Sequence, residues 1–241
     1  MAVLDEAFAS IAQAKANAER NLSNARELFE SVLEETIAGK KSGKWKVKKL
    51  GEIAEHSLGK MLDKVKNRGE YKKYLRNLNV RWFDFDLEDI AEMRFTEDES
   101  EKYTAIKGDL LICEGGYPGR GAIWQENYPI YFQKAIHRVR FENPETTKWF
   151  LYCLYAADLS GKLKKYLTGT GIQHFTGQAL DRFEFPVPPL AEQRAIVERL
   201  EALSAETGRL EAVYRSKVAG LEELKKSVLQ RAFEGELSIE N

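Results

Sequence analysis

A helical segment that occurs twice, once near each end, constrains the fold of this chain most. Residues 28–40 and 224–236 share the frame Leu-x-x-Ser-Val-Leu-x-x-x-(Ile/Phe)-x-Gly, at an offset of 196 residues. In each copy a glycine, Gly39 or Gly235, follows the helical run, where a left-handed residue commonly closes a helix. Solenoid repeats recur about every 20–50 residues, so this offset is not a solenoid period. The repeat predicts one globular unit between two equivalent long helices.

Both flanking segments have the periodicity of long helices. Residues 2–38 are rich in alanine and carry apolar residues at helical spacing, and a second helix is expected to begin at Leu190, just after Pro189. Apolar positions in the second helix alternate three and four residues apart, which is typical of a coiled-coil seam but also fits a hairpin packed within one chain. The seam consists of Thr207 and seven candidate subunit-interface residues: Leu200, Leu203, Leu210, Tyr214, Leu221, Leu224 and Val228.

The middle of the chain has a mixed pattern. Short apolar runs bounded by Gly, Pro or Asn predict strands over 79–85, 109–113 and 135–141, and longer runs predict helices over 147–159 and 162–167. The predicted fold class is therefore α+β, with one mixed α/β globular domain and two long helices that form an antiparallel coiled coil. The predicted boundaries are 1–43 for the first helix and a hinge, 44–188 for the globular domain and 189–241 for the second helix.

Composition restricts the cellular setting. The 241 residues include no uncharged apolar run of about 18 residues, so we expect no membrane span. The N-terminus lacks a basic start followed by an apolar core, which argues against a signal peptide. Cys113 and Cys153 are the only cysteines, which fits a reducing compartment better than a disulfide scaffold. We therefore expect a cytoplasmic protein.

The charge of the chain is unevenly distributed, although its net value is −1. Residues 44–81 hold 12 Lys or Arg against 4 Asp or Glu, whereas residues 82–101 hold 1 against 9. A neutral total can therefore conceal a basic face that neutralises phosphates, although the same residues could be ordinary solvated surface. The candidate phosphate contacts in the basic stretch are Lys60, Lys64, Lys66, Arg68, Lys72 and Lys73.

Catalytic motifs are missing from the sequence. It contains neither the Gly-x-x-x-x-Gly-Lys phosphate loop nor a Gly-x-Gly-x-x-Gly segment that opens a helix after a strand. His56, His137 and His174 lack metal-ligand spacing to one another and to the cysteines. We expect a non-catalytic binding protein with no metal or cofactor of its own.

Two glycine-containing loops have the composition of base or phosphate readers, with ordinary surface turns as the alternative. Glycines let the backbone approach a groove closely, glutamine can pair with an adenine edge, and arginine suits guanine or phosphate. The candidate DNA-binding residues in these loops are Tyr117, Arg120, Thr168, Thr170, Gln173 and His174.

Several stretches resemble one protein family. Residues 185–200, Phe-Pro-Val-Pro-Pro-Leu-Ala-Glu-Gln-Arg-Ala-Ile-Val-Glu-Arg-Leu, resemble the junction between a target recognition domain and the spacer helix of type I restriction–modification specificity subunits. Residues 43–53, 107–112 and 169–174 are similar to further segments of that family. Full-length members contain two recognition domains and two helices. This chain has one recognition domain between two helices and so resembles half of such a subunit.

The resemblance implies a function and a set of partners. Each recognition domain of the family reads one half of a bipartite target on double-stranded DNA, and the helices set the spacing and carry two modification subunits. Those subunits use S-adenosylmethionine to methylate adenine, and a restriction subunit can join them. A half-size chain is then expected to form a homodimer or to pair with another half-subunit. The alternatives are a coiled-coil adaptor without DNA specificity and, against the missing motifs, a stand-alone nuclease or methyltransferase.

Overall fold

The computed structural model describes residues 2–38, 45–63 and 65–234. The chain divides into two compact units, one formed by the residues up to Val32 together with those from Glu198 onward, and the other by Leu33–Val197. The first unit is helical, and the second contains all the strands described below. The predicted helix-closing residues Gly39 and Gly235 and the predicted hinge lie outside the described residues.

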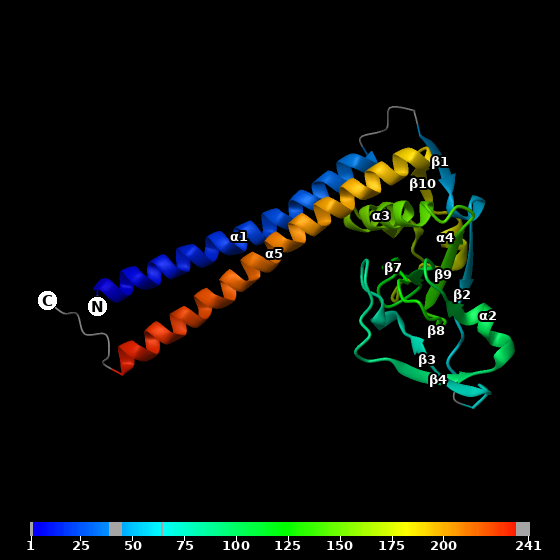
Figure 1. The fold of residues 1–241 in the computed structure, drawn as a ribbon, viewed down its shortest axis with the longest axis horizontal. Coiled ribbons are helices and arrows are strands. Elements are labelled where there is room, and N and C mark those ends of the chain that lie inside the picture. Colours follow the sequence, from blue (N-terminus) through cyan, green and yellow to red (C-terminus); the bar gives the residue numbers. More distant parts are fainter. Residues whose placement is uncertain (1, 39–44, 64, 235–241) are drawn as a thin grey trace. The chain divides into compact units, whose positions relative to one another are not determined.

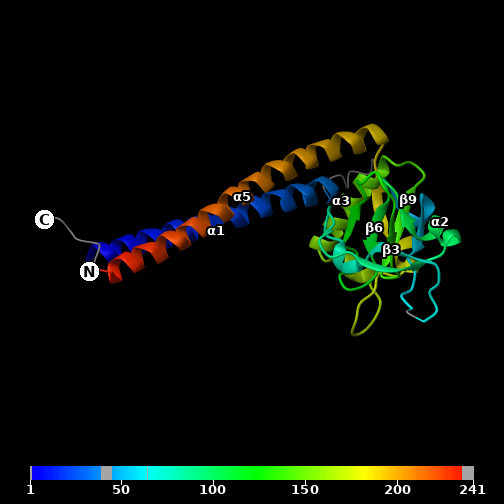
Figure 2. The ribbon, with the colours of Figure 1, turned by 60° about the horizontal axis from the view of Figure 1, so that its bottom comes forward.

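The two predicted long helices are confirmed as α1 (Ala2–Ala38) and α5 (Leu190–Phe233). Within the helical unit they lie side by side (Figures 1 and 2) and are joined by two ion pairs. Lys15 Nζ lies 2.6 Å from Glu222 Oε1, and Arg26 Nε lies 3.0 Å from Glu211 Oε2. A step toward the C-terminus of α1 is thus matched by an equal step toward the N-terminus of α5. The two helices run in opposite directions.

The buried stripe of α5 departs from the predicted heptad seam after Thr207. Leu200 and Thr207 are buried and Leu203 is half-buried, as the seam requires, but Leu210 is 40% exposed. The half-buried position is Glu211 instead, where the carboxylate bonds to Arg26 of α1. From there the half-buried positions are Glu211, Tyr214, Val218, Leu221, Val228 and Ala232, while Leu224 is 48% exposed. From Leu203 the stripe advances by four residues to Thr207 and by four again to Glu211, so it moves away from the heptad seam. The reason is that a straight helix has 3.6 residues per turn, whereas a heptad seam requires 3.5.

Three small sheets form the framework of the other unit. They have the strand orders β1-β10, β2-β9-β6-β7 and β4-β3-β8-β5, and within them only β3 and β8 pair in parallel. The strands are β1 (Lys46–Lys49), β2 (Ala54–Leu58), β3 (Glu70–Leu75), β4 (Ala91–Phe95), β5 (Thr104–Ala105), β6 (Leu110–Cys113), β7 (Gly121–Ile123), β8 (Ile130–Phe132), β9 (Ile136–Phe141) and β10 (Glu184–Val187). The helices are α2 (Ser100–Tyr103), α3 (Thr146–Leu159), α4 (Gly177–Asp181) and the 3₁₀ turns η1 (Leu50–Glu52), η2 (Asn77–Asn79), η3 (Glu97–Glu99) and η4 (Lys162–Tyr166).

The core of this unit lies between the central strands and α3. Every residue of β6 is buried, and α3 is apolar on nearly all sides, with Trp149 and Phe150 completely buried. The ring of Phe150 contacts those of Phe141 and Phe185 at centroid distances of 5.2 and 4.8 Å. Burial of a large apolar side chain contributes about 1.5–3 kcal/mol. Two of the loops described below follow β2 and β6, and the third lies between η4 and α4.

Most predicted elements of this region are confirmed, and one is wrong. The expected strands over 109–113 and 135–141 are β6 and β9, and the expected helix over 147–159 is α3. The segment over 162–167 is helical but forms the 3₁₀ turn η4.

The predicted strand over 79–85 does not form. The chain reverses direction there, with Arg81 N donating to Asp84 O at 2.8 Å. Phe83 adopts a φ of 65°, which an extended strand excludes. Its ring lies 5.0 Å from Tyr152 and 5.2 Å from Tyr155 of α3, so contacts with a distant helix outweigh the local strand preference.

Candidate nucleic-acid interface

Most of the candidate DNA-binding residues lie on three loops of the sheet-bearing unit. We name them by their residues: the 60–69 loop between β2 and β3, the 115–120 loop between β6 and β7, and the 168–174 loop between η4 and α4. Figure 2 shows the 60–69 loop in cyan and the 168–174 loop in yellow-green, both projecting from the same side of this unit.

Backbone hydrogen bonds join the bases of these loops. Lys134 N donates to Lys60 O at 2.8 Å, and the next residue, Ala135, accepts from Glu114 N at 2.8 Å. The carbonyl of Glu114 in turn accepts from Phe175 N at 2.7 Å. The chain segments at the bases of all three loops therefore lie beside one another, although more than one hundred residues separate the first from the last.

The 168–174 loop is a closed hairpin on a buried anchor. Thr168 N donates to His174 O at 2.9 Å, and His174 N donates to Thr168 O at 2.8 Å. Gly169 has a φ of 106°, and a Cβ there would lie 2.2 Å from Ile172 O, so the turn requires glycine. Phe175, the residue that follows, is completely buried. The predicted contacts Thr170 and Gln173 are exposed near the tip.

The 115–120 loop touches the 168–174 loop. A Cβ built on Gly115 would lie 3.3 Å from Nδ1 of His174, so the absence of a side chain lets the two loops meet. Arg120 donates to Asn77 O at 3.2 Å, and its guanidinium lies 4.9 Å from the centroid of the Tyr117 ring. Asp158, whose Oδ2 lies 3.5 Å from the Tyr117 hydroxyl, raises the pKa of Tyr117. Tyr117 is thus exposed but held in place by Asp158 and Arg120, and Arg120 itself is half-buried.

Lys60, a predicted phosphate contact, is buried and paired within the protein. Its side chain is buried, and its ammonium donates to Glu99 Oε2 at 2.5 Å and to Arg94 O at 2.9 Å. The ammonium also lies 5.0 Å from the centroid of the Phe95 ring. Because these partners lie within the protein, we expect Lys60 to stabilise the fold rather than to contact a phosphate.

The other predicted phosphate contacts differ in exposure and in whether they already form an ion pair. Lys64 lies outside the described residues. Lys66 and Arg68 are exposed in a turn that Asp63 organises by accepting hydrogen bonds from Val65 N and Lys66 N at 3.0 and 2.9 Å. On β3, Lys73 is exposed, whereas Lys72 is half-buried and pairs with Glu70 at 2.5 Å.

Sequence reasoning missed three residues between these loops. Asn77 Nδ2 donates to Gly115 O at 3.0 Å, and Gln133 Nε2 lies 3.4 Å from Asn77 Oδ1. Lys134 is exposed beside the base of the 60–69 loop. No motif marks these positions, because their contacts join segments that are distant in sequence: η2, the 115–120 loop and the turn 133–135.

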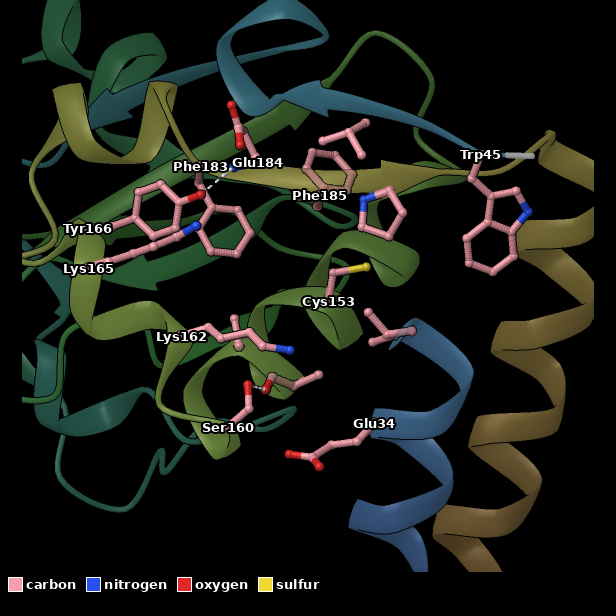
Figure 3. Close-up of a pocket in the computed structure, with 15 residues that line it drawn as sticks. Glu34, Trp45, Cys153, Ser160, Lys162, Lys165, Tyr166, Phe183, Glu184 and Phe185 are labelled. Carbon is pink, nitrogen blue, oxygen red and sulfur yellow. Dashed lines mark hydrogen bonds between the residues drawn. The ribbon is translucent and has the colours of Figure 1, made fainter. Parts of the chain in front are cut away.

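A cavity of about 470 Å³ lies in the same unit between α3, η4 and β10 (Figure 3). Its lining is largely apolar, with Lys162, Lys165 and Glu184 among the charged residues. Burial holds the pKa of Cys153 well above its usual range, so this thiol is not a reactive thiolate. The Ser160 hydroxyl donates to Ala156 O at 2.7 Å, within its own helix. The cavity therefore shows no activated nucleophile.

The described part of the chain also lacks a metal cluster, since no three His, Cys, Asp or Glu side chains converge in it. None of its helices combines the length and apolar character needed to cross a membrane. What this unit does present is a set of loops with exposed polar and basic side chains on a framework of small sheets.

The comparisons with known proteins identify the family. A model described as the type I restriction modification DNA specificity domain matches residues 42–217. The chain therefore belongs to the family of type I restriction–modification specificity subunits. Because the curated relatives are specificity subunits, this membership agrees with the expectation of a non-catalytic protein.

The chain spans about half the length of the curated relatives it matches. It is 25% identical over 206 residues to the MjaVIII specificity subunit of Methanocaldococcus jannaschii, a match that covers 82% of this chain and 47% of that one. It is 26% identical over 255 residues to the EcoKI specificity subunit of Escherichia coli K12, covering 98% and 54%. The crystal structure of the HsdS subunit from Thermoanaerobacter tengcongensis shares the fold with a TM-score of 0.63 at 19% identity, over 98% of this chain and 57% of that one.

Proposed function

We propose that this chain is a sequence-recognition subunit that reads one half of a bipartite target on double-stranded DNA and docks modification subunits. The observation that carries the proposal is the convergence of three loops at one hydrogen-bonded base, in a chain that belongs to the specificity-subunit family. In this proposal the modification subunits, and not this chain, bind S-adenosylmethionine and methylate adenine. A restriction subunit can join the same complex.

The loops offer the two kinds of contact that a specific DNA-binding protein needs. Lys66, Arg68 and Lys134 are exposed cations that can neutralise phosphates, which supply affinity without sequence information. Thr170 and Gln173 are exposed polar side chains at a fixed hairpin, and glutamine can bond bidentately to adenine. We expect Gln173→Ala and Thr170→Ala to relax the sequence choice without changing the fold.

The helices support the bipartite part of the proposal. Lys15 and Glu211 are separated by 196 residues, as are Arg26 and Glu222, which is also the offset of the repeated helix. The positions of the two ion pairs therefore exchange when α1 is superposed on α5, which supports an approximately twofold antiparallel coiled coil. One end of the pair carries a recognition domain on the chain that connects α1 to α5. We propose that an equivalent domain from a second copy, or from a different half-subunit, attaches at the other end.

The predicted subunit-interface residues divide into two groups under this proposal. Leu200, Leu203, Tyr214, Leu221 and Val228 belong to the stripe that α5 turns toward α1 of the same chain, so they stabilise the coiled coil itself. Leu210 and Leu224 remain exposed and are available to a partner.

The exposed leucines suggest where modification subunits dock. Leu28 and Leu224 occupy equivalent positions of the repeat and are 49% and 48% exposed. Two equivalent apolar positions fit two identical partners. We expect Leu28→Asp or Leu224→Asp to leave one modification subunit bound, and the double variant to leave none. Native mass spectrometry of the purified complex measures this stoichiometry.

Methylome sequencing of cells that co-express this chain with a modification subunit tests the proposal. A gapped palindromic methyladenine motif would indicate two copies of the chain, and an asymmetric motif would indicate a second, different recognition domain. No motif, together with no salt-dependent binding of the complex to duplex DNA, would refute DNA recognition and favour an adaptor role.

A further inference from the structure

One exposed residue of the 168–174 loop remains without a role in the proposed function. Ile172 is 76% exposed at the tip of the hairpin, between Gly171 and Gln173. Single exposed apolar residues are common on protein surfaces, so exposure alone carries little weight. The position of Ile172 is more informative, because the cross-loop hydrogen bonds of Thr168 with His174 hold the tip in one conformation.

The shape of the hairpin favours one groove of DNA. Gly169 and Gly171 have no side chains, and a Cβ built on Gly171 would meet nothing within 4 Å, so the tip is narrow and open. In this loop two chain segments lie side by side, joined by the single bridge pair Thr168 and His174. Two adjacent segments fit the major groove, which is about 12 Å wide, but not the minor groove, which is about 6 Å wide. Side chains at this tip would therefore meet the major-groove edges of base pairs.

The neighbouring side chains match the two bases of an A·T pair. In the major groove adenine presents N6 and N7, and thymine is marked by its C5-methyl group. Gln173 carries the amide suited to adenine, and Ile172 carries an apolar group suited to a methyl. We propose that Ile172 is a specificity residue that contacts the C5-methyl group of a thymine, in the same base pair that Gln173 reads or in an adjacent one. This inference rests on the proposed DNA recognition.

Replacing thymine with uracil tests the contact, because uracil lacks only the C5-methyl group. Once the methylome motif is known, each thymidine of the half-site is exchanged for deoxyuridine, and binding of the full methyltransferase complex is measured. The variants are Ile172→Ala, Ile172→Leu and, as a matched control, Val47→Ala, which removes a β-branched side chain that is 64% exposed on β1. Both positions are exposed, so the fold should be unchanged.

The expected pattern is specific to one thymine. For the unaltered complex and for Val47→Ala, uracil at one position should weaken binding about fourfold, the value of one buried methyl group. Ile172→Ala should bind the thymine and uracil duplexes equally well, and Ile172→Leu should recover most of the difference. Equal uracil sensitivity in Ile172→Ala and the unaltered complex would overturn the thymine contact while leaving DNA recognition intact. Absence of any selected motif would overturn both.

Discussion

Replacement of Lys60 by methionine tests whether this lysine stabilises the fold or contacts DNA. Methionine keeps the length and apolar stem of the side chain but removes two hydrogen bonds, to Glu99 and to the carbonyl of Arg94. Hydrogen bonds from a charged donor contribute about 1.5–3 kcal/mol each, and contact of methionine with Phe95 offsets part of the loss. Because Glu99 is only 24% exposed, its carboxylate would be left poorly solvated. We expect Lys60→Met to lower the free energy of unfolding by about 2–4 kcal/mol.

Two assays distinguish this outcome from a phosphate contact. Denaturant unfolding, followed by tryptophan fluorescence, measures the loss of stability. The slope of log affinity against log salt, measured below the unfolding transition, counts the phosphates that the protein neutralises. Lys60→Met should leave this slope unchanged, whereas Lys66→Met should reduce its magnitude by about one. A folded Lys60→Met protein of normal stability with a reduced slope would refute the structural role of Lys60.

Three further predictions concern the loop, a buried histidine and the helices. Gly169→Ala should weaken specific DNA binding about tenfold in a gel-shift titration, because an alanine at this positive φ costs about 1–3 kcal/mol. The control Gly171→Ala should bind with an affinity within about twofold of the unaltered protein. Equal effects of the two variants would contradict the hairpin geometry. Burial, and then the charge of His56, lower the pKa of His137 to about 4. Between pH 6.5 and 4, His137 therefore binds a proton in the unfolded protein but not in the folded protein. Stability should therefore fall as the pH drops through that window, by at most about 1.4 kcal/mol per pH unit, and His137→Asn should flatten the curve; an unchanged slope would contradict it. Arg26→Ala and Glu211→Ala should show a coupling of about 0.3–1 kcal/mol in a double-mutant cycle, and additive effects would argue against their pairing.

Local pattern was sufficient to predict several elements of the fold. The long helices, β6, β9 and α3 have strong periodicity or continuous apolar runs, so their local preferences agree with their tertiary surroundings. The glycines and polar residues of the 168–174 loop likewise indicate an exposed turn, and the structure has a hairpin there in which Gly169 takes a positive φ. The repeated segment by itself indicates two equivalent helices.

Tertiary contacts decided what the local pattern left open. The segment over 79–85 has strand-like composition, but the rings of Tyr152 and Tyr155 hold Phe83 in a conformation that no strand permits. In the sequence, Lys60 cannot be told apart from a basic surface residue. In the structure it is buried and forms an ion pair with Glu99, which is distant in sequence. Sequence periodicity thus indicated the long helices, β6, β9 and α3, because near neighbours alone favour these elements. The tertiary structure alone determined which charged residues remain free and which loops meet, because both depend on residues distant in sequence.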